Sequence, residues 1–312
     1  MGASGLRVSA LGLGTMTWGR DTDEHEAADQ IRAFVDAGGA LVETAAHYGD
    51  GAAEALLGSF LGTAVDRSEV TITTTAGVRA GRPDASRGNL LDTLDASLAR
   101  LRTDHVDLWL VQAPDAHTPA HETVDALSIA VRSGRARYVG VANHPGWATG
   151  RLGALLSAAG GPGLAAVEAE YSLLERGIER EVLPAAVALG AGVLAWSPLG
   201  RGVLAGRYRH HVPADSRAAS VHLRGFVEPY LNDTCYGVVE AVATAADGLG
   251  WSAAEVALSW VAGAPGIACA IVGARTAAQL RGVLPAAQRT LPGAIRAALA
   301  ETTAPVLGYP ER

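Results

Sequence analysis

The sequence contains no lysine, because all 25 basic residues among its 312 are arginine. This absence excludes mechanisms that need a lysine amine, such as Schiff bases, pyridoxal phosphate anchoring or a phosphate-loop lysine. Two cysteines, Cys235 and Cys269, are too few for a disulfide framework or a four-ligand zinc site. His210, His211 and His222 have no acidic partner at metal spacing, so no metal site is expected.

Charge and hydropathy exclude further classes of binding partner. The 32 acidic residues outnumber the basic ones, giving a net charge of −7 with no basic cluster, so no nucleic-acid partner is expected. No apolar run is long enough to cross a membrane, and the N-terminus lacks the features of a secretory signal. We therefore expect a cytoplasmic protein without a membrane partner. The sequence contains no heptad pattern, so it predicts no particular oligomeric state.

The chain is expected to form one domain, because no linker divides residues 1–312 and 49% of them are hydrophobic. Short apolar, β-branched runs alternate with segments of helical spacing, which predicts βα units and a parallel sheet. The predicted strands are residues 11–14, 40–44, 70–74, 106–112, 138–142, 165–170, 192–196 and 267–272. The predicted helices include residues 23–37, 52–61, 87–101, 121–132, 178–188 and 253–262.

Eight such alternations favour an α/β fold of the (β/α)8 TIM barrel type over an open doubly wound sheet. A short N-terminal β-hairpin and a long loop after strand seven complete the predicted architecture. In such a barrel, function resides on the loops that follow the carboxyl ends of the strands. The residues just after each predicted strand are therefore the candidates for the site.

Seven segments, taken in order, cover essentially the whole chain. They read LGLGTMTWG, ETAAHYGDGAAEALLG, RTDHVDLWLVQAPD, GRARYVGVANHPGW, EYSLLERGIEREVLPAA, AWSPLGRGVLAGRY and IVGARTAAQL. In this order they resemble the successive motifs of the aldo-keto reductase family. The resemblance implies a (β/α)8 barrel that binds NADPH across its mouth and reduces carbonyl groups with an Asp, Tyr, Lys and His tetrad.

Three of the four implied tetrad positions are replaced in this sequence. Tyr48 is kept, but Glu43 replaces the Asp, Thr75 the Lys and Gln112 the His. In the family's chemistry the lysine cation lowers the phenol pKa from its ordinary value of about 10. Without that cation, Tyr48 is expected to be a poorer acid, and ordinary ketone reduction is expected to be very slow.

Other side chains at the strand ends offer partial replacements. Gln112 can donate an amide hydrogen bond to a carbonyl oxygen, and Glu43 can accept from Tyr48 or bind a cationic group. His47 is a candidate general acid or base near neutral pH, although a position on the rim explains it as well. Arg79 lies four positions beyond the lysine site, and its guanidinium does not titrate.

The resemblance also implies the residues that hold NADPH. Near the nicotinamide, Asn143 is kept, Glu168 replaces a Gln, and Trp196 offers an aromatic face for stacking. An ionised Glu168 can accept from the carboxamide amine but cannot donate to its oxygen. A guanidinium at Arg275 suits the 2′-phosphate. The other implied cofactor residues are Ser197, Leu199, Arg201, Gly202, Gly273 and Gln279.

Three functions are compatible with these residues. The first is an NADPH-dependent reductase of an activated carbonyl, an enone or an iminium in a small molecule such as a secondary metabolite. The second is a non-redox enzyme that uses Tyr48 and Glu43 for proton transfer, dehydration or cyclisation. The third is a catalytically silent barrel that binds NADP(H). The resemblance favours the first function, whereas the replaced tetrad favours the second.

Overall fold

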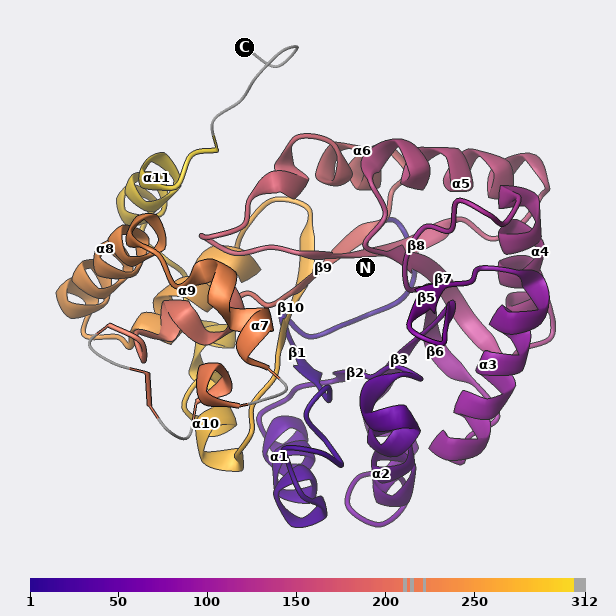
Figure 1. Cartoon of the computed structure of the whole chain (residues 1–312), viewed down its shortest axis with the longest axis horizontal. Helices are drawn as coiled ribbons and strands as arrows, with labels where there is room; N and C mark the ends of the chain where they lie inside the picture. Colours follow the sequence, from indigo (N-terminus) through magenta and orange to yellow (C-terminus); the bar gives the residue numbers. More distant parts are fainter. Residues whose placement is uncertain (210–211, 214–215, 221–222, 306–312) are drawn as a thin grey trace.

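Eight short strands close into one parallel barrel in the computed structural model of the chain (Figure 1). The structure describes residues 1–209, 212–213, 216–220 and 223–305. Around the barrel the order is β1-β10-β9-β8-β7-β6-β3-β2, and neighbouring strands pair in parallel. The strands are β1 (Leu11–Gly14), β2 (Leu41–Glu43), β3 (Thr71–Ala76), β6 (Val106–Val111), β7 (Ala136–Ala142), β8 (Leu164–Glu170), β9 (Gly192–Trp196) and β10 (Ile267–Val272).

Helices surround the barrel on its outer side (Figure 1). Side-chain caps define several of their starts: Asp23 accepts from the Glu26 backbone N–H at the start of α1, and Ser252 with Glu255 forms a capping box at α9. The helices are α1 (Glu24–Asp36), α2 (Ala52–Phe60), α3 (Arg87–Leu101), α4 (Ala120–Arg132), α5 (Gly146–Ala158), α6 (Val182–Ala188), α7 (Arg224–Val227), α8 (Asp233–Leu249), α9 (Ala253–Ala262), α10 (Ala277–Arg281) and α11 (Gly293–Thr302).

The apolar side chains form two cores. The larger core fills the space between the strands and the outer helices. The smaller core fills the barrel interior. It includes Leu41 from β2, Leu108 and Leu110 from β6, and Leu194 from β9. Because the interior is packed, the barrel is a rigid support for the loops at its carboxyl end and not a pore.

The predicted (β/α)8 barrel is confirmed, but the predicted N-terminal hairpin is wrong. Residues 1–10 contain no strand. Their path is set instead by the floor of the barrel, where the Ala3 N–H donates to the Gly190 carbonyl at 2.7 Å and Leu6 packs into the inner core. The described hairpin lies elsewhere, between β4 (Val78–Arg79) and β5 (Arg82–Pro83) after the third barrel strand.

The long segment predicted after the seventh barrel strand is also present. After β9 the chain runs through a 3-10 turn at Gly200–Ala205, a second at Arg217–Ala219, helix α7 and a third turn at Glu228–Tyr230 before α8 begins. The predicted absence of a metal site at His210, His211 and His222 concerns positions outside the described residues. Within the described part of the chain, no helix has the length and apolarity needed to span a membrane.

Candidate active site

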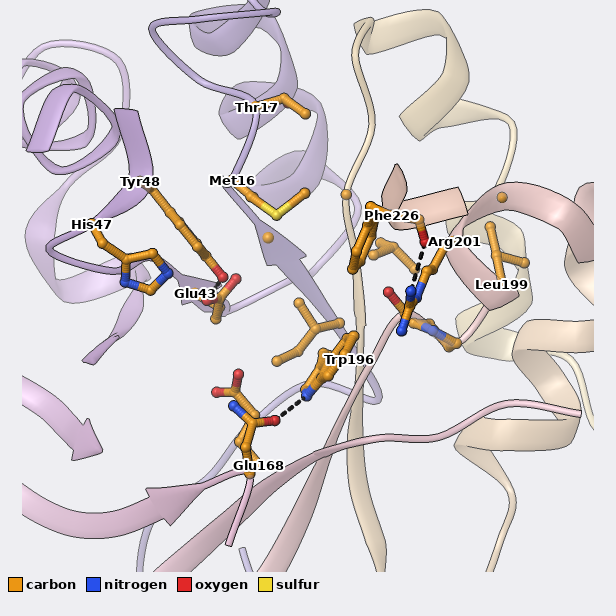
Figure 2. Close-up of a pocket in the computed structure, with 18 of the residues that line it drawn as sticks. Met16, Thr17, Glu43, His47, Tyr48, Glu168, Trp196, Leu199, Arg201 and Phe226 are labelled. Atoms are coloured by element: carbon orange, nitrogen blue, oxygen red, sulfur yellow. Dashed lines mark hydrogen bonds between the residues drawn. The ribbon is translucent and has the colours of Figure 1, made fainter. Parts of the chain in front are cut away.

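The carboxyl ends of the barrel strands enclose a cavity of about 220 Å³. Glu43 comes from the end of β2, Glu168 from β8 and Trp196 from the end of β9. Figure 2 shows these side chains facing the same space together with Tyr48 and Arg201. The cavity brings together twelve of the predicted site residues, namely Glu43, His47, Tyr48, Gln112, Asn143, Glu168, Trp196, Ser197, Leu199, Arg201, Gly202 and Gly273.

Tyr48 and Glu43 form the hydrogen-bonded pair at the centre of the cavity. The Tyr48 hydroxyl donates to Glu43 Oε1 at 2.8 Å. Burial, followed by the charges of Glu43 and Glu168, raises the pKa of Tyr48 well above its ordinary value. Tyr48 is therefore a phenol that holds its proton tightly, as expected from the loss of the lysine.

Glu43 and Glu168 form a second pair, this time of like groups. Both side chains are only 4% exposed. Burial raises the pKa of Glu43 to about 7, with the hydrogen bond from Tyr48 opposing the rise. Burial and then the charge of Glu43 raise the pKa of Glu168 well above its ordinary value. Burial and the charge of Glu43 therefore both favour the protonated form of Glu168.

Thr75, at the lysine position, does not supply a replacement for the cation. Its side chain is 2% exposed, and its Oγ1 has no hydrogen-bond partner among the described residues. It is the last residue but one of β3 and is not among the residues that line the cavity. Arg79 is an exposed residue of the β4–β5 hairpin, so a swing of its guanidinium toward Tyr48 has no support in the structure.

His47 lies at the edge of the cavity, next to Tyr48. The two rings pack edge to face with centroids 4.8 Å apart. Burial lowers the pKa of His47, and the Glu54 carboxylate opposes this shift. The imidazole is therefore mostly neutral at pH 7, which leaves it able to accept or relay a proton.

Asn143 holds Trp196 in place above the cavity. The Trp196 indole N–H donates to Asn143 Oδ1 at 3.0 Å, while the Asn143 amide donates to the Gln112 carbonyl at 3.0 Å. The backbone of Asn143 is left-handed, with φ of 56°, a conformation that asparagine adopts more readily than most residues. Asn143, which follows β7, thus links the end of β6 to the indole at the end of β9.

Arg201 is bound within the loop that follows β9. Its guanidinium makes a two-pronged ion pair with Glu170, at 2.8 and 2.6 Å, and donates to the Phe226 carbonyl at 2.6 Å. It lies over the rings of Phe226 and Tyr230, and Phe226 in turn stacks on Trp196. This cluster fixes the loop over one end of the cavity (Figure 2).

A second cavity of about 450 Å³ adjoins the first. Its wall contains Arg275 and Gln279, and Gln279 accepts from the Arg275 backbone N–H at 3.1 Å. The two cavities share a wall formed by Leu199, Arg201, Gly202, Val272 and Gly273. Apart from Thr75, the predicted site residues therefore line two adjoining cavities, one holding Tyr48 and the other Arg275.

Several residues of the site are not apparent from the sequence motifs. Glu170, Phe226 and Tyr230 form the cluster around Arg201. Phe226 and Tyr230 come from the long segment after β9, where no periodic pattern identifies them. By contrast, Met16 and Thr17 directly follow the first predicted strand and line the cavity as candidates of that kind. Glu170 carries a detectable signal, since it ends a predicted strand at the barrel mouth.

Comparisons with known proteins agree with this geometry. The model of the aldo/keto reductase family matches residues 10–301. An uncharacterized oxidoreductase of Bacillus subtilis, YrpG, is 34% identical over 93% of this chain and 91% of its own length. Two proteins named probable voltage-gated potassium channel subunit beta are similar as well: that of Oryza sativa subsp. japonica is 34% identical over 88% of this chain and 86% of its own, and that of Arabidopsis thaliana is 32% identical over 90% and 88%.

A family match over nearly the whole chain establishes the class. The chain belongs to the aldo/keto reductase family. Its relatives include a named oxidoreductase as well as potassium channel beta subunits, and members of this family typically bind a nicotinamide cofactor.

Proposed function

We propose that this protein is an NADPH-dependent reductase of an activated carbonyl, enone or iminium group in a small molecule. The observation that carries the proposal is the pair of adjoining cavities, one lined by Tyr48 and Glu43 and the other by Arg275 and Gln279, which share wall residues from the loop after β9. An extended dinucleotide needs such a cleft, with a reacting end and a phosphate-binding end separated along one wall.

The residues along the cleft fit the cofactor. Gly202 has a φ of 99° and open space where a Cβ would stand, so a phosphate can approach its backbone. At the other end, Glu168 Oε2 is buried without a hydrogen-bond partner among the described residues. A protonated carboxyl has one O–H donor and one carbonyl acceptor, so Glu168 can replace the amide of a glutamine toward a carboxamide.

Each residue then has a defined task. Trp196, held by Asn143, would support the nicotinamide ring, Glu168 its carboxamide, and Arg275 the 2′-phosphate. The bound cofactor would supply the hydride. For a carbonyl substrate, Tyr48 would donate its proton to the substrate oxygen and recover one from protonated Glu43, its hydrogen-bond partner at 2.8 Å.

Quenching of tryptophan fluorescence by NADPH and by NADH tests this proposal without a substrate. We expect micromolar binding of NADPH and weaker binding of NADH. Arg275→Ala is expected to weaken NADPH binding by about tenfold or more and NADH binding far less, since only NADPH carries the 2′-phosphate. Arg281→Ala removes an exposed arginine at the end of α10, the helix that follows Arg275, and is the matched control. Failure of NADPH to bind at millimolar concentration would overturn the proposal.

One observation favours a non-redox function as the second candidate. Glu43 and Tyr48 form a ready proton-transfer pair that contacts no cation among the described residues. Such a pair suits dehydration or ring closure without a cofactor. Turnover that needs no NADPH would support this candidate, whereas NADPH binding without any turnover would support a silent nucleotide-binding barrel.

A further inference from the structure

The chain pairs its other buried carboxylates with arginine, but not Glu43 and Glu168. Glu54 is fully buried and accepts from Arg100 at 2.7 Å, and Glu255, which is 7% exposed, pairs with Arg289 at 2.9 Å. By contrast, no ion pair reaches Glu43 or Glu168 from the described residues, and the sequence has no lysine to provide one. The reacting end of the cleft is thus acidic and lacks its own counter-charge.

A second observation indicates that the Glu168 carboxyl is directed at a space that a ligand occupies. Glu168 is 4% exposed and lines the cavity, yet its Oε2 has no hydrogen-bond partner among the described residues. Buried polar atoms in native proteins are nearly always paired, so an unpaired oxygen on a cavity wall indicates a group that arrives with a ligand. Figure 2 shows Glu43 and Glu168 directed toward the space between Tyr48 and Trp196.

The groups around the pair set which carboxyl ionises. Tyr48 and His47 approach from the loop after β2, Glu168 from β8 and the buried thiol of Cys269 from β10. Burial, followed by the charge of a neighbouring carboxylate, raises the pKa values of Tyr48, Cys269 and Glu168, which favours their protonated forms. Glu43, with a pKa of about 7, is the group that carries the negative charge as the pH rises.

We propose that the reacting end of the cleft takes a cationic nitrogen, an iminium or a protonated imine, with the Glu43 carboxylate as its counter-ion. This inference rests on the proposed reductase function and names its substrate class. The aromatic rings of Tyr48 and Trp196 on the cavity wall also suit a cation, because the face of an aromatic ring is electronegative.

Reduction of an iminium does not require the strong proton donor that this site lacks. Transfer of a hydride from the reduced nicotinamide forms a C–H bond at the iminium carbon, and the π electrons of the C=N bond become the lone pair of nitrogen. The nicotinamide is oxidised, the product is a neutral amine, and this step consumes no proton. A site whose Tyr48 is a weak acid can therefore reduce an iminium, whereas a ketone requires a proton on oxygen.

Binding of a fixed-charge probe to the cofactor-free protein tests the inference. We would measure dissociation constants of the N-methyl-dihydroisoquinolinium cation and of α-tetralone, a neutral ketone of similar shape, from about pH 5.5 to about pH 8.5. The cation is expected to bind more tightly than the ketone. Its affinity is expected to rise as the pH passes through about 7, where Glu43 ionises, while that of the ketone stays constant.

Variants localise the effect. Glu43→Gln is expected to weaken binding of the cation by roughly tenfold to a hundredfold at the high end of the pH range and to remove its pH dependence. Glu301→Gln, which removes an exposed carboxylate of α11, is the matched control and is expected to bind as the wild type does. Equal affinity for cation and ketone, or a Glu43→Gln variant that keeps the preference, would overturn the inference.

The inference and the proposed function fail in distinguishable ways. If NADPH binds and ketones are reduced, but the cation binds no better than the ketone, the substrate class is wrong and the reductase stands. If NADPH does not bind, the reductase function is wrong, whatever the affinity for the cation.

Discussion

Burial and two neighbouring carboxyls hold Tyr48 in its phenol form, with its hydroxyl committed to Glu43 at 2.8 Å. At the scale of single residues, this contact separates the chain from the tetrad that its family motifs imply. Among the described residues no cation pairs with the phenol or with Glu43, and in the proposed mechanism Glu43 returns a proton to Tyr48. If Thr75 stands at the lysine position, as the motifs imply, we expect the site to protonate fewer substrates.

Substitution of Tyr48 by phenylalanine separates acid-dependent from acid-independent reduction. Turnover of an activated ketone such as an α-keto ester is expected to fall by about 100-fold to 1,000-fold, because the proton donor is lost. Turnover of an iminium is expected to stay within about tenfold, since hydride transfer to it requires no proton. Steady-state rates of NADPH oxidation with both substrates measure the contrast. Equal losses for the two substrates would show that Tyr48 does not act as the acid.

Stability is expected to depend on pH through Glu43. Its pKa of about 7 in the folded state exceeds the ordinary value of 4.5, so between these pH values the folded chain binds more protons than the unfolded one. The free energy of unfolding contributed by Glu43 therefore falls as the pH rises through this window. Glu43→Gln, which cannot ionise, is expected to be more stable than the wild type by roughly 1–3 kcal/mol above about pH 8.

At about pH 4 the same substitution is expected to bring no gain in the free energy of unfolding, because Glu43 is protonated in both the folded and the unfolded state. Urea unfolding of Glu43→Gln and of the exposed control Glu301→Gln at the two pH values measures the difference. A gain of the same size at both pH values would contradict the assignment of Glu43 as the titrating group.

At the scale of elements, the strands were the most predictable part of the chain. Each barrel strand lies where a short apolar run predicts it, because a strand buried on both faces reads as nearly continuous hydrophobic sequence. Helix α5 is not among the predicted helices, since Gly146, Gly150 and Gly153 resemble loop residues. Two of these glycines are packing residues: a Cβ at Gly146 would lie 2.6 Å from the Glu181 carbonyl, and one at Gly153 2.7 Å from Leu189.

The site was predictable only where residues follow strand ends. Tyr48, Glu43, Trp196 and Arg275 follow or end predicted strands and line the cleft as expected. Phe226 reaches the cavity through a folded segment whose path depends on tertiary contacts, which no local pattern encodes. The same limitation explains the wrong N-terminal hairpin, because contacts with the barrel floor determine that segment.

The packing of α2 on the end of α3 provides a test at this scale. A Cβ at Gly58 would lie 2.3 Å from the Arg100 carbonyl oxygen. Gly58→Ala is therefore expected to lower the free energy of unfolding by about 1–3 kcal/mol, since the two helices must move apart. Gly150→Ala in α5 is the matched control. Its Cβ meets no atom within 4 Å, and it is expected to stabilise the protein by about 0.5–1 kcal/mol. Equal effects in denaturant titrations would contradict the close approach.

At the scale of the whole molecule, the barrel keeps a long cleft while changing one end of it. The end proposed to bind phosphate contains Arg275 and Gln279, and Arg201 holds the loop after β9 through its ion pair with Glu170. The reacting end instead presents Glu43 and Glu168 without a cation from the described residues. A barrel with this arrangement suits a nicotinamide cofactor together with a positively charged substrate.

The most direct test is the rate of NADPH oxidation by the wild-type protein with two substrates of similar shape. With saturating NADPH, we expect kcat/KM for N-methyl-dihydroisoquinolinium to exceed that for α-tetralone by at least about a hundredfold, the combined effect of charge pairing at Glu43 and of a weak acid at Tyr48. A ketone rate equal to or greater than the iminium rate would contradict the account of the altered reacting end.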